Sequence, residues 1–192
     1  MGKEFEIKFA ATPAQLAEIQ ADHGDFFRIS METTYYDAAD GALSARHITL
    51  RRRLENGTSV CTVKTPQSVH GRGEWETECD SIEAAIPVLC KLGCPEDLLA
   101  LTSCGITQVC GARFTRLAKE LVADSCTLEL ALDQGLLLGG EKEQPLCEAE
   151  LELKSGSEEA ALAFAKDFSA RYSLVPEAKS KFRRALSLAT EA

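Results

Sequence analysis

Apolar and charged residues alternate along most of the extended segments of this chain. In the stretch 4–9, EFEIKF, two phenylalanines and an isoleucine alternate with two glutamates and a lysine. Successive side chains of a β-strand point to opposite faces, so this pattern predicts a strand with one apolar and one ionic face. The same alternation recurs in the segments 49–54, 60–64, 72–78, 128–133 and 148–154.

Turn and cap residues divide the chain into eight predicted strands and three or four helices. The pair Asn56-Gly57 is a strong signal for a tight hairpin between two of the strands. Thr12, Ser81 and Ser157 are predicted to cap helices, because their side-chain oxygens can accept a hydrogen bond from the first turn. The predicted strands span 1–10, 26–38, 47–55, 58–66, 70–80, 105–121, 126–133 and 147–155, and the helices span 12–22, 82–93, 158–172 and 179–189.

The composition is that of one globular domain. No repeat with a period of roughly 20 to 50 residues, no Pro/Ser-rich linker and no low-complexity run divides the 192 residues. We therefore predict a single α+β domain over residues 1–192, with strand neighbours that are mostly antiparallel. No run approaches the roughly 20 apolar residues that a bilayer crossing requires, so a membrane-spanning protein is not expected.

Net charge and cysteine usage narrow the class of partner and the compartment. A formal charge of −9 and a pI near 4.9 argue against a nucleic acid or an anionic membrane as partner, because both need a basic footprint. No apolar segment follows a basic start, so no secretory signal is recognised, and the eight cysteines suit the reducing cytoplasm. Cys90 and Cys94 lack a CxxC spacing and a nearby histidine, so packing is favoured over a zinc site.

The signs of the charges are sorted by strand. Carboxylates concentrate in Glu-x-Glu pairs on the first and final strands, whereas the hairpin between them carries arginines and a lysine. An open sheet with one solvated polar face is one interpretation. A sheet closed into a barrel, with the ionic face inside, is the other; there the carboxylates suit a divalent cation, and the arginines and lysines suit a polyanion. The sorting favours the barrel, since a solvated face would more usually mix the signs.

Seven short motifs follow one another along the chain: EFEIK, LRRR, TVK, EWE, ELALDQG, CEAELE and SKFRR. Together they resemble the CYTH superfamily, the triphosphate tunnel metalloenzymes, over almost the whole sequence. The resemblance implies an eight-stranded antiparallel closed β-barrel with flanking helices and a C-terminal closing helix, which binds a triphosphate along its axis. The run ALDQG…PLCEAELEL is most similar to the bacterial inorganic triphosphatase branch. Some of its members carry an additional helical CHAD domain, which is not expected here.

Carried onto this sequence, the resemblance implies three groups of site residues. The ligands for Mg²⁺ or Mn²⁺ are Glu4, Glu6, Glu148 and Glu150. The catalytic carboxylates are Glu4, Glu6, Glu74, Glu76 and Asp133, the last three as ligands of a second ion or as groups that orient water. The phosphate-binding residues are Lys8, Arg51, Arg53, Lys64, Arg116, Lys181 and Arg184.

Some positions depart from the family pattern or are left open. Arg113 and Arg116 have opposite parity on one predicted strand, and Arg116 matches the family position better. The family usually has a second basic residue just after this position. Here Ala118 and Lys119 follow, so no residue matches that position clearly. Glu78, Glu152 and Lys154 share the ionic parity, and the sequence does not decide whether they lie in the lumen or at its rim.

The implied activity is metal-dependent hydrolysis of inorganic triphosphate to pyrophosphate and phosphate, with a small polyanion as the only expected partner. A class IV adenylyl cyclase, a thiamine-triphosphatase and a polyphosphate-binding module without turnover are the alternatives. Trp75 has the apolar parity and nothing marks an adenine platform, which disfavours the first two. The Glu-x-Glu pairs disfavour a pure anion binder. The sequence gives neither the preferred metal nor the oligomeric state.

Overall fold

The computed structural model describes residues 2–66, 71–94, 97–123 and 125–190, with the backbone alone for residues 2–4 and 71–72. Within these residues the strands are β1 (Gly2–Ala10), β2 (Phe27–Ala38), β3 (Thr49–Glu55), β4 (Thr58–Pro66), β5 (Gly71–Glu78), β6 (Ile106–Ala123), β7 (Cys126–Gly139), β8 (Lys142–Gly156) and β9 (Val175–Pro176). The helices are α1 (Pro13–His23), α2 (Ala42–Ala45), α3 (Ile82–Lys91), α4 (Leu98–Leu101), α5 (Glu158–Arg171) and α6 (Lys181–Thr190). These elements confirm the predicted α+β class.

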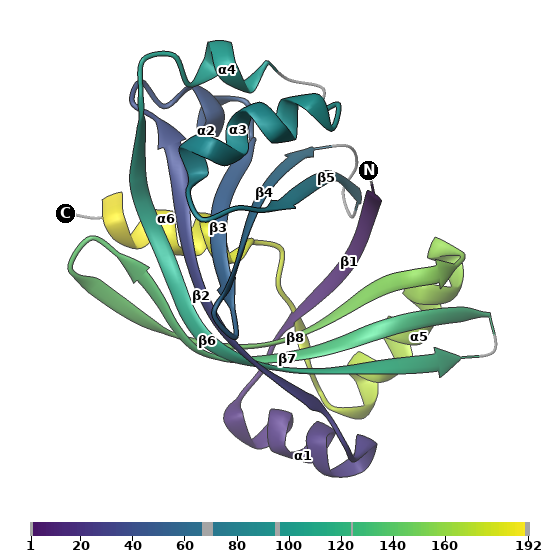
Figure 1. The fold of residues 1–192 in the computed structure, drawn as a ribbon. Helices are drawn as coiled ribbons and strands as arrows, with labels where there is room; N and C mark the ends of the chain where they lie inside the picture. The colour runs from purple at the N-terminus through teal and green to yellow at the C-terminus, as the bar shows by residue number, and fades with distance from the viewer. Residues whose placement is uncertain (1, 67–70, 95–96, 124, 191–192) are drawn as a thin grey trace.

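All strands belong to one antiparallel sheet, in the order β5-β4-β3-β2-β6-β7-β8-β1-β9. β1 also pairs with β5, from Gly2↔Glu74 to Phe5↔Gly71, so two strands from distant places in this order lie side by side (Figure 1). The eight predicted strands are present, and β9 is additional. Its two residues pair with the end of β1, and a segment this short has no period for sequence reasoning to detect.

The β7–β8 hairpin is longer than predicted. The predictions ended one strand at residue 133 and began the next at residue 147, whereas β7 runs to Gly139 and β8 starts at Lys142. Residues 134–147 pair in register across this hairpin, and Gly140 turns the chain with a φ of +59°. The stretch GLLLG has apolar residues on both faces, so it lacks the alternation that identified the other strands. The short helices α2 and α4 were also not predicted.

The predicted helix caps are confirmed. Thr12 Oγ1 accepts a hydrogen bond from the N–H of Gln15 at 3.2 Å, and the Gln15 side chain accepts one from the N–H of Thr12 at 2.8 Å. Ser81 and Ser157 cap α3 and α5 in the same way, through their hydroxyl oxygens. Among the described residues, no helix combines the length and the apolar character that would let it cross a membrane.

Two apolar clusters cover the outer face of the sheet. One packs α1 and α5 against β1, β7 and β8, and the other packs α2, α3 and α4 against β3, β4 and β5 (Figure 1). Burying one leucine or phenylalanine side chain stabilises a fold by roughly 1.5–3 kcal/mol, and a slip of one residue would turn every such side chain to the other face. Because the apolar side chains of each strand are buried on the outer face, the alternating charged side chains must point to the inner face.

Helix α6 lies on the inner face, against β6, β7 and β8. Phe182 and Ala185 of α6 pack with Leu137 and Leu146 of the β7–β8 hairpin. A Cβ atom at Gly139 would lie 2.4 Å from the carbonyl oxygen of Ala185, so only glycine permits this approach. The helix therefore covers one part of the inner face of the sheet and leaves the remainder uncovered.

Candidate functional site

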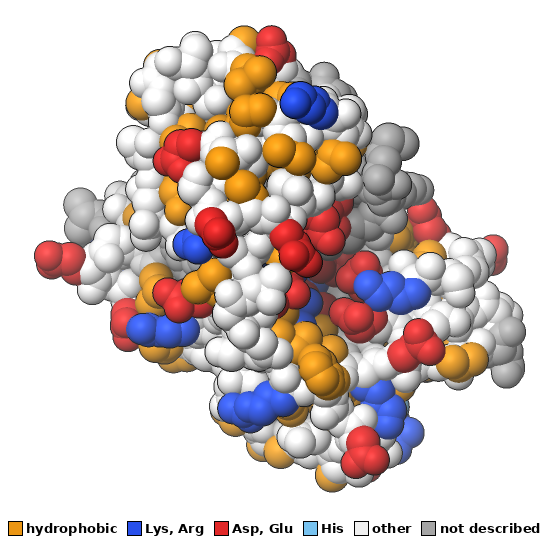
Figure 2. Space-filling model, viewed as in Figure 1, with side chains coloured by type: hydrophobic (Ala, Val, Ile, Leu, Met, Phe, Trp, Pro, Cys, Tyr) orange, Lys and Arg blue, Asp and Glu red, His pale blue; other side chains and the backbone are white. Residues whose placement is uncertain are grey.

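A cavity of about 290 Å³ lies on the inner side of the sheet. Inner-parity side chains from each of β1 to β8 line it, together with the first residues of α6. Its volume is near the lower end of the roughly 300–1,000 Å³ that is typical of small-molecule sites. Carboxylates gather around the hollow on this side of the molecule (Figure 2).

Opposite charges balance along the described lining of the cavity. Seven basic and seven acidic side chains line it, although the chain as a whole has a formal charge of −9. The basic residues are Lys8, Arg51, Arg53, Lys64, Arg116, Lys154 and Lys181, and the acidic residues are Glu6, Glu55, Glu74, Glu76, Glu129, Glu150 and Glu152. Because neither sign is in surplus, a polyanion that enters this cavity needs cations of its own to offset its charge.

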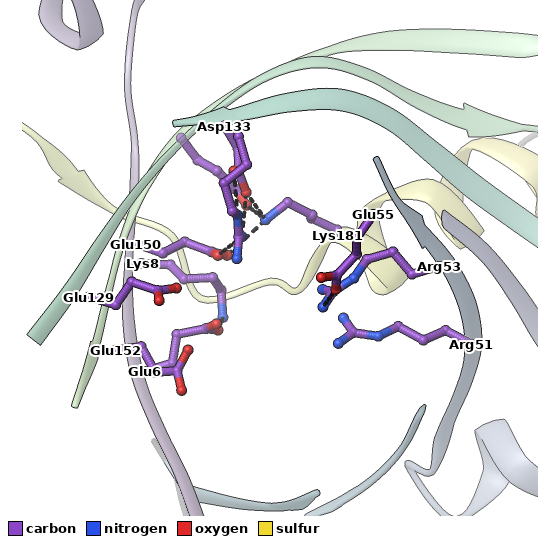
Figure 3. A network of polar contacts seen from close by, with 12 residues as sticks. Glu6, Lys8, Arg51, Arg53, Glu55, Glu129, Asp133, Glu150, Glu152 and Lys181 are labelled. Atoms are coloured by element: carbon purple, nitrogen blue, oxygen red, sulfur yellow. Dashed lines mark hydrogen bonds and ion pairs between the residues drawn. The ribbon is translucent and has the colours of Figure 1, made fainter. Parts of the chain in front are cut away.

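The two signs face each other across the open space. Arg51 and Arg53 of β3 point into it from one side, and glutamates of β1, β7 and β8 point into it from the other (Figure 3). On this acidic wall, Glu6 is the direct cross-strand partner of Glu152, which is itself the partner of Glu129. Directly opposed like charges destabilise a sheet, and in this structure the ammonium groups of Lys8 and Lys154 offset the row of carboxylates.

The wall formed by β3, β4 and β5, called the basic wall here for its Arg51, Arg53 and Lys64, also carries three glutamates, Glu55, Glu74 and Glu76. One oxygen of Glu74 lies 3.4 Å from Arg51 Nη2 and 3.2 Å from Lys64 Nζ. Burial disfavours the charged form of Glu74, but Lys64 and Arg51 outweigh this effect and hold its pKa below the usual value. Glu74 thus keeps two cations together at the cavity wall.

Three buried carboxylates lie deeper than the acidic wall. Oxygen atoms of Asp133, Glu148 and Glu150 come within 4.8 Å of one another, a spacing at which they can share a cation. The ammonium of Lys181 lies among them, 2.8 Å from Asp133 Oδ2, 2.8 Å from Glu150 Oε1 and in contact with Glu148. In this structure Lys181 is therefore the cation that the trio shares.

Two arginines complete this deep cluster. Arg116 donates from Nε and Nη2 to the two oxygens of Asp133, at 2.8 and 2.7 Å, and also to Glu150. Arg184 donates to Glu148. Three cations thus offset three carboxylates, whereas a buried charge that loses its partner typically costs about 3–5 kcal/mol.

Burial and pairing shift the pKa values of the cluster. Burial raises the pKa of Glu148 to about 7 despite the neighbouring Lys181, and the charge of Glu150 adds to this rise. For Glu150, burial acts in the same direction, but Lys181 and Arg116 outweigh it and hold the pKa well below the usual value. Burial opposes the charge of Lys181 too, yet its carboxylate partners raise its pKa well above the usual value.

Most of the predicted site residues lie at the cavity wall. These are Glu6, Lys8, Arg51, Arg53, Lys64, Glu74, Glu76, Arg116, Glu150 and Lys181. Asp133, Glu148 and Arg184 do not line the cavity as described; they lie behind its wall in the deep cluster, where Asp133 and Glu148 are 0% exposed. Glu4 belongs to β1, but its side chain lies outside the described part of the structure.

Four further charged residues line the cavity without having been given a role from the sequence. Lys154 places its ammonium 2.9 Å from Glu152 and 3.7 Å from Glu129, next to the row on the acidic wall. Glu55 pairs with Arg53 two residues earlier on β3. Glu152 and Lys154 were recognised from the sequence by their ionic parity, but their place in the lumen or at its rim was left open. Glu55 and Glu129 have the same parity on their strands, so alternation could also have identified these two.

The two arginines of β6 lie on opposite faces, as their parity predicted. Arg116 faces the cavity, whereas Arg113 has a side chain that is 61% exposed and lies 3.5 Å from Glu143. Lys119 donates to the carbonyl oxygen of His23 and is not among the residues that line the cavity. Arg116 is therefore the basic residue of β6 at this site.

A sequence profile of the CYTH domain matches residues 2–186. Among curated proteins, an inorganic triphosphatase from Haemophilus influenzae is 31% identical over 169 residues, which cover 82% of this chain and 47% of that protein. The chain thus spans about half the length of this relative.

Solved structures share the fold. A candidate adenylyl cyclase from Hippeastrum with a dominant triphosphatase activity aligns over 97% of this chain and 96% of its own, with a TM-score of 0.67 and 17% identity. A candidate adenylate cyclase from Bacillus halodurans aligns over 96% and 98%, with a TM-score of 0.65 and 19% identity. At these identities the similarity extends to the fold alone.

Proposed function

Because the chain belongs to the CYTH domain family, we propose that it is a metal-dependent triphosphatase, which hydrolyses inorganic triphosphate to pyrophosphate and phosphate. The inorganic triphosphatase among its relatives supports the activity. The observation that carries the proposal is that one cavity is lined both by cations suited to phosphate and by carboxylates suited to a metal ion. One wall offers arginines and a lysine for phosphate oxygens, and the other offers carboxylates for a metal ion.

In this proposal the sheet is a closed tunnel. The pairing of β1 with β5 supports closure, because it brings together two strands that lie toward opposite ends of the sheet order. Helix α6 then blocks one end, where Phe182 and Lys181 reach the lining. A triphosphate enters from the other end and lies along the basic wall.

The phosphate oxygens take the place that Glu74 holds in the structure. Arg51 and Lys64 both contact one Glu74 oxygen, so they are already placed to bind a single anionic group. Lys8, Arg116 and Lys181 approach the same space from other strands and from α6. Such fixed cations stabilise phosphoryl transfer without reorganising during the reaction.

The acidic wall fits Mg²⁺ or Mn²⁺, because its donors are carboxylate oxygens and both ions prefer such ligands. We assign ligand roles to Glu6 and Glu150, with Glu152 beside them in register, and Glu4 remains a ligand by sequence alone. A bound divalent ion would supply charge neutralisation at the phosphate oxygens. The balanced lining supports this requirement, since it has no surplus cation to offset the substrate's charge.

Hydrolysis then needs an in-line water and no covalent nucleophile. The water oxygen forms a bond to the terminal phosphorus as the bridging P–O bond breaks, and the leaving pyrophosphate keeps the electron pair of that bond. A carboxylate of the acidic wall accepts the proton of the water. Glu76 lines the cavity and is exposed, so it remains a candidate for orienting this water.

The proposal is tested by phosphate release from tripolyphosphate in the presence of Mg²⁺ or Mn²⁺. Lys64→Ala and Glu6→Gln should each lower kcat/KM by at least about 100-fold, as expected on losing one preorganised electrostatic group. Arg113→Ala is the matched control, because it removes a charge from the outer face of the same sheet. Wild-type turnover in both cavity variants would reject the site.

A parallel incubation with ATP separates hydrolysis from cyclisation. The structure disfavours an adenine platform at Trp75, which is 5% exposed and packs in the apolar cluster beneath α3. We expect no cyclic AMP. Formation of cyclic AMP without phosphate release from tripolyphosphate would replace the proposed activity by that of a cyclase.

A further inference from the structure

Glu148 is a predicted metal ligand that does not reach the cavity. Its side chain is 0% exposed and is not part of the described lining, whereas Glu150, two residues further along β8, is part of it. Both residues have the inner parity, so they differ in depth and not in direction. Glu148 stands opposite Asp133 of β7 in the sheet register, in the part of the inner face that α6 covers.

Both oxygens of Glu148 contact α6. One contacts Lys181 Nζ, and the other accepts a hydrogen bond from Arg184. Lys181 and Arg184 are three residues apart in the helix, so they lie on one face of it, one turn apart. A single carboxylate therefore ties the first turn of α6 to β8.

The position of Glu148 marks the boundary between the packed and the open part of the inner face. Leu146 precedes it on this face and packs in the apolar cluster with Phe182 and Ala185 of α6. Glu150 follows it and lines the cavity. Beyond Leu146, toward the turn of the β7–β8 hairpin, the close approach of Gly139 to Ala185 shows that the helix is pressed against the sheet.

We propose that Glu148 is a positioning residue and not a metal ligand: it anchors α6 through Arg184 and holds the ammonium of Lys181 at the cavity wall. Glu148, unlike Glu150, does not line the cavity, and both of its oxygens already contact cations of α6. A metal ion could therefore bind Glu148 only by displacing Lys181 or Arg184 from a fully buried carboxylate, which is costly. The metal ligands are then the carboxylates that face the cavity. This inference rests on the proposed function only for the role of Lys181 toward phosphate.

The first test measures Mn²⁺ binding to the full chain by electron paramagnetic resonance, without substrate. Glu148→Gln should leave the Mn²⁺ dissociation constant within about twofold of wild type, whereas Glu6→Gln should raise it at least about tenfold. A loss in Glu148→Gln as large as that in Glu6→Gln would overturn the assignment. Glu6 is the positive control because it lines the cavity.

The second test follows the docking of α6 by hydrogen exchange, which needs neither metal nor turnover. Exchange within residues 181–190 should rise in Glu148→Gln and in Arg184→Gln. The double variant, which keeps the charges of the cluster balanced, should be no more mobile than either single variant, because both changes break the same contact. Unchanged exchange in Glu148→Gln would contradict the proposal, even if the wild type proves not to be a triphosphatase.

The third test separates positioning from a direct catalytic role. In the wild type, Glu148→Gln should lower kcat/KM for tripolyphosphate, because Lys181 is no longer held in place. In a Lys181→Met background, the same change should cost no more than about twofold, since the residue acts through Lys181. An undiminished loss in that background would show that Glu148 acts on the substrate or its metal directly and would overturn the proposal.

Discussion

Three glutamates of β8 have different environments at this site. The environment of each depends on how deep its side chain lies beneath the cavity wall. Glu152 is partly exposed on the acidic wall, Glu150 reaches the wall from the deep cluster, and Glu148 is fully enclosed, although the three alternate along one strand. All three have the ionic parity in the run CEAELEL. Their partners separate them, since Lys154 contacts Glu152 at the surface and Arg184 contacts Glu148 beneath it.

A titratable cluster outside the cavity makes one pH dependence predictable. His23 ends α1, and its Nε2 lies 3.1 Å from the hydroxyl of Tyr172, which also donates to Asp22. Burial lowers the pKa of His23 below 6.5, and the nearby charges of Arg171 and Lys119 act in the same direction while Asp22 opposes them. The folded protein therefore binds a proton at His23 less readily than the unfolded chain does.

It follows that His23 contributes stability above pH 6.5 and that this contribution is lost as the pH falls through its lowered pKa. As the pH is lowered from about 7.5 to about 5, we expect the urea midpoint of the wild type to decrease relative to that of His23→Gln, which lacks this titrating group. The same change at the exposed His47 gives the comparison for losing a histidine elsewhere. Parallel pH profiles for wild type and His23→Gln would contradict this assignment.

Helix α6 is the element on which the shape of the site depends. It ends the cavity, supplies Lys181 to it and is held by a glycine contact as well as by ion pairs. Gly139→Ala would place a Cβ 2.4 Å from the carbonyl oxygen of Ala185 and 2.6 Å from the N–H nitrogen of Ala189, so the helix must shift away from β7.

For Gly139→Ala we expect a loss of about 1–3 kcal/mol in the free energy of unfolding, as for overpacking of a close-packed site. Urea denaturation measures it, and Glu141→Ala at the exposed tip of the same hairpin is the control. Phosphate release should fall as well, because Lys181 moves with the helix. Wild-type stability of Gly139→Ala would show that α6 is not docked against β7 as described.

Sequence reasoning identified the elements whose hydrophobic alternation or cap residues were clear. It failed where contacts with another element determine the structure. The Asn56-Gly57 hairpin and the caps at Thr12, Ser81 and Ser157 depend on local chemistry and were found. The far half of the β7–β8 hairpin was missed, because α6 covers its inner face and removes the need for polar residues there.

The residues of the candidate site could likewise be predicted only in part from the sequence. Nine of the predicted residues on the cavity wall lie on strands, and alternation along each strand is enough to turn their side chains to that face. Parity contains no information about depth, so it could not separate Glu148 from Glu150, to which the resemblance gave the same role. It also could not show that Lys181 of a helix would lie among three carboxylates of the sheet.

At the scale of the whole molecule, the balanced lining gives an acidic protein a local site for the proposed polyanion. The field of a chain with a formal charge of −9 opposes the approach of a free triphosphate. The charges that face the cavity cancel within the described lining, so binding depends on local donors and on cations that enter with the substrate. We therefore expect activity to vanish when the divalent ions are chelated.

The central claim is that this cavity hydrolyses a terminal phosphoanhydride with the help of a divalent cation. Phosphorus-31 NMR of tripolyphosphate incubated with the full chain and Mg²⁺ or Mn²⁺ tests it most directly, because substrate and both products give separate signals. We predict that the tripolyphosphate signals are replaced by pyrophosphate and phosphate in equal amounts, and that EDTA stops the conversion. An unchanged tripolyphosphate spectrum with either metal would contradict the account.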